Sequence, residues 1–252
     1  KNTGDFGSTV EVEGPTIEVW IGTGRDQATI IRQLIDDTFV EEHNINVQLK
    51  MVNMGVLLSA TLSGNGPDIA IGIDQKTPVN WGIRNAIKDL SQFDDFEEVA
   101  TRFNQSALTA LQYDGKTYGL PDTEDFLVMF YRKDILEEIG ITEDLIPKTW
   151  EDIIDISPTL QKHYFDFYIP ILQGDLSPVL HSMIIQEQGK LYINDGAESG
   201  LMEKGSLNAF LNFTRFFTDY GFVLEANFIN RFRSGEMPIG ISNYTTYNSL
   251  AV

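Results

Sequence analysis

Several features are scarce or missing in this 252-residue chain, and each absence excludes a class of function. There is no cysteine, which excludes thiol catalysis, thiolate metal sites and disulfide bonds. None of the three histidines, His43, His163 and His181, has another histidine three or four residues away, so zinc motifs of the His-Glu-x-x-His type are missing. The sequence therefore indicates no metal and no redox cofactor.

Basic residues are also few, since 18 Lys and Arg stand against 37 Asp and Glu, for a net charge of −19. A nucleic-acid partner would need a concentrated basic surface, so this balance argues against one. No apolar run approaches the ~20 residues of a transmembrane helix, and no stretch reads as a signal peptide. The acidic excess is spread over both halves of the chain, which favours a role in solubility.

The first half of the chain alternates strands and helices after a polar, glycine-rich leader over residues 1–14 that reads as a tether. Strands are predicted over 16–21, 44–49 and 67–73. Helices are predicted after Asp26, which can cap the first of them with apolar positions Ile30, Ile31, Leu34, Ile35 and Phe39, and over 55–62, 79–87 and 103–111. Strand–helix–strand order indicates a parallel sheet with right-handed crossovers.

A second α/β block follows, with a β-prone run at 126–131 and a short final strand at 238–241. Pro170 lies inside a further predicted strand, 165–172, which suggests an edge position. Thr149 and Asp152 form a near-miss of a capping box at the start of one helix. The other predicted helices span 132–139, 180–188 and 205–220. The last carries aromatic residues at helical spacing, read as core: Phe210, Phe213, Phe216, Phe217 and Tyr220.

Several motifs occur in a fixed order along the chain. They are Ser63–Ile69 (SGNGPDI), Gly115–Pro121 (GKTYGLP), Met129–Ile141, Pro147–Asp152 (PKTWED) and Phe232–Ile241 (FRSGEMPIGI). In this order, over roughly residues 16–252, they resemble the extracellular solute-binding proteins of ABC importers, in the sugar-binding group that includes maltose-binding protein.

The resemblance implies an α/β fold like that of periplasmic binding proteins, with two lobes joined by a hinge and a ligand cleft between them. Residues 15–120 would form an incomplete N-terminal lobe, and residues 121–252 the C-terminal lobe after the crossover. Members of the family are typically longer and return to the first lobe after the Gly-Glu-Met-Pro-Ile-Gly-Ile strand. This chain stops near that point, so the return segment and its ligand groups are expected to be missing.

The resemblance also implies a function without catalysis. The expected role is to bind a carbohydrate or other small polar solute in the cleft and to deliver it to the membrane subunits of an ABC permease. The location implied is extracytoplasmic, in the periplasm or at the cell surface through a lipid anchor, whose modified cysteine would precede Lys1. The chain is expected to act as a monomer.

Ligand groups are expected where loops follow the strands, since the carboxyl ends of parallel strands meet at one edge. Some have structural alternatives: Asp26 can cap a helix, Trp81 can anchor a core, the crossover acids can be solvated hinge charges, and the tyrosines can be surface residues. The candidate ligand-binding residues are Arg25, Asp26, Asp74, Gln75, Trp81, Glu124, Asp125, Gln173, Asp175, Asn243, Tyr244 and Tyr247.

Two other functions remain open on the residues alone. Glu124 and Asp125 could be the paired acids of a glycoside hydrolase, although adjacent strand residues point to opposite faces. A sensor or adhesion module could reuse the two-lobe fold. The enzyme would turn over a glycoside, the receptor would bind without forming product, and the sensor would bind a membrane receptor domain.

Overall fold

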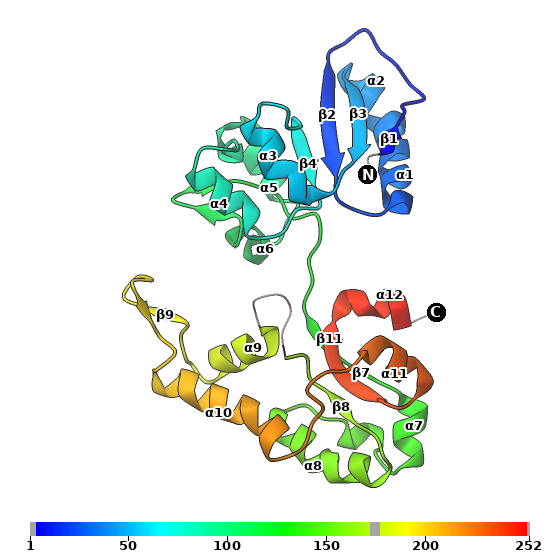
Figure 1. Cartoon of the computed structure of the whole chain (residues 1–252), viewed down its shortest axis with the longest axis vertical. Coiled ribbons are helices and arrows are strands. Elements are labelled where there is room, and N and C mark those ends of the chain that lie inside the picture. The colour runs from blue at the N-terminus through cyan, green and yellow to red at the C-terminus, as the bar shows by residue number, and fades with distance from the viewer. Residues whose placement is uncertain (1–3, 172–176, 251–252) are drawn as a thin grey trace. The chain divides into compact units, whose positions relative to one another are not determined.

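The computed structural model describes residues 4–171 and 177–250 of the chain. The chain divides into two compact units, unit 1 over Lys1–Glu124 and unit 2 over Asp125–Val252 (Figure 1). The sequence predicts the crossover slightly earlier, after residue 120. No helix in the described ranges is both long enough and apolar enough to cross a membrane.

Unit 1 is built on a sheet with the strand order β1-β3-β2-β4. The strands are β1 (Gly4–Phe6), β2 (Thr16–Ile21), β3 (Asn46–Met51) and β4 (Ile69–Ile71). The central strand β2 pairs in parallel with both β3 and β4. The predicted parallel sheet is therefore confirmed, and its apolar core forms around Val19, Ile21, Val47 and Leu49.

The predicted helices of unit 1 are present in the predicted order; the first extends to His43, and the helix over Phe96–Ala100 was not predicted. The helices and helical turns are α1 (Arg25–Leu34), the π-helical turn η1 (Ile35–Phe39), α2 (Val40–His43), η2 (Met54–Val56), α3 (Leu57–Leu62), α4 (Thr77–Ile83), η3 (Leu90–Gln92), α5 (Phe96–Ala100) and α6 (Gln105–Thr109). A small antiparallel hairpin joins β5 (Gln112–Tyr113) to β6 (Lys116–Thr117). Ile30 and Leu34 were predicted to line the buried face of α1, but they are 59% and 56% exposed.

The leader is the clearest correction to the sequence prediction, because it is not an unstructured tether. Its residues Gly4–Phe6 form β1, which pairs antiparallel with β3. Farther along, the side chain of Asn46 accepts from the backbone N–H of Val12 and donates to the carbonyls of Val12 and Gly14. The edge of β3 presents backbone groups that need partners, and the leader supplies them.

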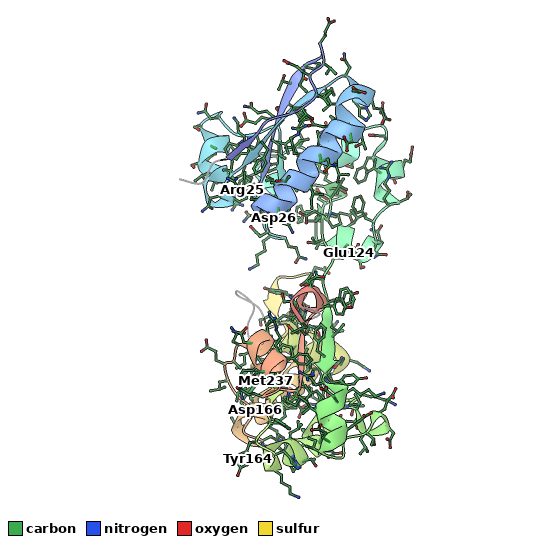
Figure 2. The ribbon with its side chains drawn as sticks, turned by 90° about the vertical axis from the view of Figure 1, so that its right-hand side faces the viewer. Arg25, Asp26, Glu124, Tyr164, Asp166 and Met237 are labelled. Carbon is green, nitrogen blue, oxygen red and sulfur yellow. The ribbon has the colours of Figure 1, made fainter. Side chains whose placement is uncertain are left out.

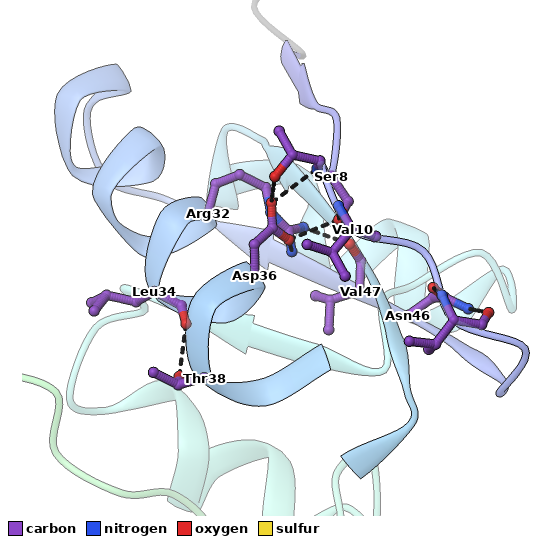
Figure 3. A network of polar contacts seen from close by, with 10 residues as sticks. Ser8, Val10, Arg32, Leu34, Asp36, Thr38, Asn46 and Val47 are labelled. Carbon is purple, nitrogen blue, oxygen red and sulfur yellow. Dashed lines mark hydrogen bonds and ion pairs between the residues drawn. The ribbon is translucent and has the colours of Figure 1, made fainter. Parts of the chain in front are cut away.

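A buried polar network fixes the leader to the first helical segment (Figure 3). Arg32 and Asp36 are each 6% exposed and form an ion pair, and the Arg32 guanidinium also donates to the carbonyl of Val47 at 2.6 Å. The Asp36 carboxylate accepts from the Ser8 hydroxyl at 2.7 Å and from the backbone N–H and hydroxyl of Thr9, both at 3.0 Å. Burial acts to raise the pKa of Asp36, but these hydrogen bonds outweigh it and hold the pKa below its ordinary value.

Unit 2 contains a three-stranded mixed sheet in the order β7-β11-β8. Its strands are β7 (Leu127–Tyr131), β8 (Phe167–Tyr168) and β11 (Ile239–Asn243). The central strand β11 pairs antiparallel with β7 and in parallel with β8. The strand that precedes Pro170 is thus at the edge, as predicted. A separate hairpin joins β9 (Tyr192–Ile193) to β10 (Glu198–Ser199).

Helices and short turns surround this sheet, and the core lies between it and the longest helices. They are α7 (Lys133–Glu138), η4 (Glu143–Leu145), α8 (Trp150–Lys162), α9 (Pro178–Gln186), α10 (Lys204–Thr218), α11 (Phe228–Ser234), η5 (Tyr244–Thr246) and α12 (Tyr247–Leu250). The start of α8 carries a complete capping box, in which Thr149 and Asp152 bond reciprocally. On α10, Phe213 and Phe216 are buried as predicted, but Phe210 lies beside the buried arc and is 51% exposed.

We expect Asp36→Asn to destabilise unit 1 by about 3 kcal/mol, because it leaves the buried Arg32 cation without its counter-charge. Fluorescence of Trp20 and Trp81 during urea unfolding, in a Trp150→Phe background, reports on unit 1 alone. The exposed neighbour Asp37 is the matched control, and Asp37→Asn should change stability by no more than about 0.5 kcal/mol. Equal effects of the two substitutions would contradict the assigned role of the network.

The same pair of variants predicts a pH dependence. The pKa of Asp36 is lowered in the folded state, so its ionised carboxylate stabilises the fold above the ordinary value of 3.8, and this contribution is lost as pH falls through the lowered pKa. The stability difference between the parent chain and Asp36→Asn should therefore be constant near neutral pH and shrink below about pH 4. A difference that grows on acidification would have the wrong sign.

Candidate functional site

The parallel strands of unit 1 bring two polar loops to one edge of the sheet. Ile21, the last residue of β2, pairs with Ile71, the last residue of β4. Residues 22–26 leave the sheet directly beside residues 72–75, and the backbone N–H of Gly22 donates to the Ile71 carbonyl at 3.0 Å. This edge therefore carries the two predicted clusters, residues 25–26 and residues 74–75, on adjacent loops.

Two glycines permit this close approach of the loops. A Cβ on Gly22 would lie 2.9 Å from the carbonyl oxygen of Gly72, and Gly72 itself has a φ of +77°, which disfavours other residues. Between the loops, the hydroxyl oxygen of Thr23 is buried and has no hydrogen-bond partner among the described residues. The edge therefore holds a polar atom whose bonding capacity is unused within residues 4–171 and 177–250.

Three of the predicted ligand groups at this edge are exposed and form no side-chain hydrogen bond or ion pair with the described residues. Arg25 and Asp26 lie together in the first turn of α1 (Figure 2), and Gln75 lies on the loop after β4. None of their side chains bonds or ion-pairs with another described residue. Asp26 does not cap α1, because the N-cap is Gly24 and the cap has no side-chain hydrogen bond. These side chains are therefore free to bind hydroxyl groups.

Asp74 is used differently, because its carboxylate holds the start of α4. It accepts from the Thr77 hydroxyl at 2.6 Å and from the backbone N–H groups of Lys76 and Thr77 at 2.9 and 3.1 Å. The Thr77 hydroxyl and these N–H groups hold the pKa of Asp74 below its ordinary value, despite partial burial. Asp74 thus positions its loop and remains ionised.

Two further predicted residues of unit 1 also make internal contacts. Trp81 is half-buried and packs against the cluster of Trp20, Val52 and Leu57. It therefore anchors the core, the structural alternative to its predicted role in ligand binding. Glu124, at the end of the unit, accepts a hydrogen bond from the side-chain amide of Asn104 at 2.6 Å. Asn104 was missed in the sequence, because nothing in its spacing marks it as a partner of a residue so far along the chain.

Unit 2 presents three aromatic rings that stack in series at the start of β7 and the end of β11. The ring centroids of Phe126 and Tyr244 are 5.2 Å apart with planes inclined by 7°, and those of Tyr244 and Tyr247 are 6.4 Å apart with planes inclined by 6°. The three side chains are 58%, 51% and 55% exposed. We call Phe126, Tyr244 and Tyr247 the aromatic ladder; the tyrosines were predicted as stacking residues, and Phe126 was read only as part of a strand.

Asp125 fixes the turn that carries this ladder. Its carboxylate accepts from the backbone N–H of Thr245 at 3.2 Å and from the Thr245 hydroxyl at 2.7 Å. The backbone N–H of Tyr244 donates to the Phe126 carbonyl at 2.8 Å, continuing the β7–β11 pairing beyond Asn243. Asp125 therefore acts on the ladder through the turn it anchors, and Asn243 is the last strand residue before it.

Gln173 and Asp175 lie outside the described residues. Within the described ranges, no group of three or more His, Asp or Glu side chains gathers as metal ligands.

Comparison with known proteins identifies the family. Residues 35–251 match the family described as bacterial extracellular solute-binding protein. The chain belongs to this family. This chain is 32% identical to the arabinooligosaccharide-binding protein of Halalkalibacterium halodurans over 100 residues. The matched residues make up 39% of this chain and 22% of that protein. The chain is also 30% identical over 115 residues, 45% of its length, to a binding protein of Brucella abortus (strain 2308), of which it covers 28%.

Solved structures show the same fold at lower identity. The sugar-binding protein MalE of Xanthomonas citri matches with a TM-score of 0.74 and 17% identity, over 94% of this chain and 62% of that one. A cyclo/maltodextrin-binding protein complexed with maltotetraose matches with a TM-score of 0.75 and 17% identity, over 96% and 63%. The α/β fold of sugar-binding proteins is thus confirmed. The chain spans less than two thirds of these structures and about a quarter of the curated relatives.

Family membership also bears on the catalytic alternative, because the family and its structural neighbours are binding proteins rather than enzymes. The acids of the proposed glycosidase pair, Glu124 and Asp125, are each engaged by a different residue, Asn104 and Thr245. The prediction of a non-enzymatic protein is therefore confirmed at the level of the family.

We expect the side chains of Asp125 and Thr245 to be energetically coupled, because the Thr245 hydroxyl donates to the Asp125 carboxylate at 2.7 Å. A double-mutant cycle of Asp125→Asn and Thr245→Val, measured by urea unfolding, should give a coupling of about 0.5–1 kcal/mol, small because the pair is exposed. Asp122, whose carboxylate bonds only the adjacent Thr123 among the described residues, serves as control, and Asp122→Asn should show no coupling to Thr245→Val. Strict additivity at Asp125 would contradict the anchoring role.

Proposed function

We propose that this solute-binding protein binds a carbohydrate outside the cytoplasm and presents it to the membrane subunits of an ABC permease. The observation that carries the proposal is the aromatic ladder of Phe126, Tyr244 and Tyr247. Exposed aromatic faces can cover the apolar C–H faces of sugar rings, and a cluster of exposed aromatic side chains is typical of ligand-binding surfaces.

Hydrogen-bonding groups in unit 1 support the same ligand class. Arg25, Asp26 and Gln75 are exposed and offer charged and amide groups whose side chains have no partner among the described residues. Charged donors and acceptors make the stronger hydrogen bonds to hydroxyl groups. Each unit thus carries groups suited to a polyhydroxylated solute, although their arrangement does not specify one sugar.

The names of similar proteins point in the same direction. The curated relative from Halalkalibacterium halodurans is named for arabinooligosaccharide, and one matched structure holds maltotetraose. Delivery to a permease and a location in the periplasm or on a lipid anchor follow from the same family assignment and are part of the proposal. We further propose that the protein acts as a monomer.

Calorimetric titration with mono- and oligosaccharides tests the proposal. We expect saturable binding of at least one sugar without release of new reducing ends, and we expect Tyr244→Ala to weaken it at least about tenfold, or ~1.4 kcal/mol, through the lost stacking surface. Tyr192→Ala is the matched control, since Tyr192 is 68% exposed on the β9–β10 hairpin away from the ladder.

Three outcomes would count against the proposal. Binding of peptides but of no sugar would remove the carbohydrate assignment. Equal losses in Tyr244→Ala and Tyr192→Ala would remove the ladder from the site. Turnover of a glycoside would restore the enzyme alternative.

A further inference from the structure

Unit 2 contains a cavity of about 370 Å³ among helices α8, α9 and α10. None of its lining residues belongs to the aromatic ladder or to the strand ends that carry it. The volume is within the range of small-molecule sites. Figure 1 shows the three helices as neighbours in unit 2.

Apolar and aromatic side chains line one part of this cavity, and polar side chains line the rest. Met183 and Phe216 are buried at 3% and 1% exposure and form its floor, while Trp150 and Tyr220 are half-buried at its sides. The rings of Trp150 and Phe216 pack with centroids 5.9 Å apart. The indole N–H of Trp150 donates to the Gln186 side chain at 2.6 Å, which fixes the orientation of the ring.

The rim of the cavity is acidic. Glu151, Asp155 and Glu187 line it, and none of these carboxylates has a hydrogen bond or ion pair with another described residue. Glu151 and Asp155 are four residues apart on α8, so their charges lie on one helix face and repel each other. A cation bound between them would relieve this repulsion.

The cation that lines the cavity, Arg215, is already committed. Its Nε donates to Asp219 at 3.0 Å, its Nη2 donates to the Tyr220 hydroxyl at 2.9 Å, and its guanidinium carbon lies 5.6 Å from the centre of the Tyr220 ring. Arg215 therefore compensates Asp219 and leaves the three rim carboxylates without a counter-charge.

We propose that this cavity binds a small organic ammonium ion, with its alkyl body against Trp150, Phe216 and Met183 and its charge beside Glu151, Asp155 and Glu187. Carboxylates beside apolar and aromatic side chains favour such cations, because the carboxylates attract the ammonium group while the apolar side chains accept the alkyl chain. This site is separate from the carbohydrate function proposed above and uses none of its residues.

The test compares 1,5-diaminopentane with 1,5-pentanediol, a neutral molecule of similar shape, in 150 mM NaCl. Calorimetry should show saturable 1:1 binding of the diamine and none of the diol, and the indole N–H signal of Trp150, assigned with Trp150→Phe, should shift in nuclear magnetic resonance spectra. The triple variant Glu151→Gln, Asp155→Asn, Glu187→Gln should bind the diamine at least about tenfold more weakly.

A matched triple variant controls for the strongly acidic surface. Asp195→Asn, Glu198→Gln, Glu203→Gln removes the same charge from exposed positions of unit 2 outside the cavity and should leave diamine binding within about twofold. Circular dichroism checks that both triples fold. No diamine binding, equal losses in the two triples, or an unshifted Trp150 signal would each overturn the proposal, and sugar titrations of the cavity triple should be unchanged.

Discussion

The antiparallel pairing of β7 with β11 is the contact on which the aromatic ladder depends. It sets Leu127 opposite Asn243, so the residues just beyond, Phe126 and Tyr244, meet although they are far apart in sequence. A shift of one residue in this register would turn every side chain of the strand to the opposite face and separate the rings of Phe126 and Tyr244. The Asp125–Thr245 bonds extend the contact between the two strands into the turn that follows β11.

Acidic residues in this protein divide into those that hold structure and those that remain available. Asp74 bonds Thr77 at the start of α4, Asp125 anchors the turn after β11, and Asp36 completes a buried network with the leader. Each is surrounded by N–H or O–H donors, which favour the ionised carboxylate. Asp26 and the rim acids of the helical cavity have no such donors within residues 4–171 and 177–250, and these are the carboxylates on which the binding proposals rest.

Much of the fold could be predicted, because its signals are local. The alternation of β2, α1 and β3 follows from hydrophobic periodicity, and the capping box at Thr149 follows from residue types at fixed spacing. The family could be identified because several motifs occur in order. These signals place Tyr244 and Tyr247 after a strand, but a local pattern cannot show which rings they stack on.

What the sequence missed depends on contacts between distant residues. The bond of Asn104 to Glu124 and the stacking of Phe126 on Tyr244 arise only once the sheets are assembled. The leader was read as a tether because its composition is polar, while its partner is the backbone edge of β3, which composition cannot reveal. Phe210 was assigned to the core by spacing alone, but on α10 it lies just beside the face that buries Phe213 and Phe216.

The most direct test of the account is a carbohydrate titration of the chain with its Phe and Tyr rings isotopically labelled, followed by nuclear magnetic resonance. If the aromatic ladder is the sugar platform, the ring signals of Phe126, Tyr244 and Tyr247 shift together and saturate with the calorimetric affinity, while those of Tyr192 and Tyr164 do not move. Saturable sugar binding that leaves all three ladder rings unshifted would contradict the account.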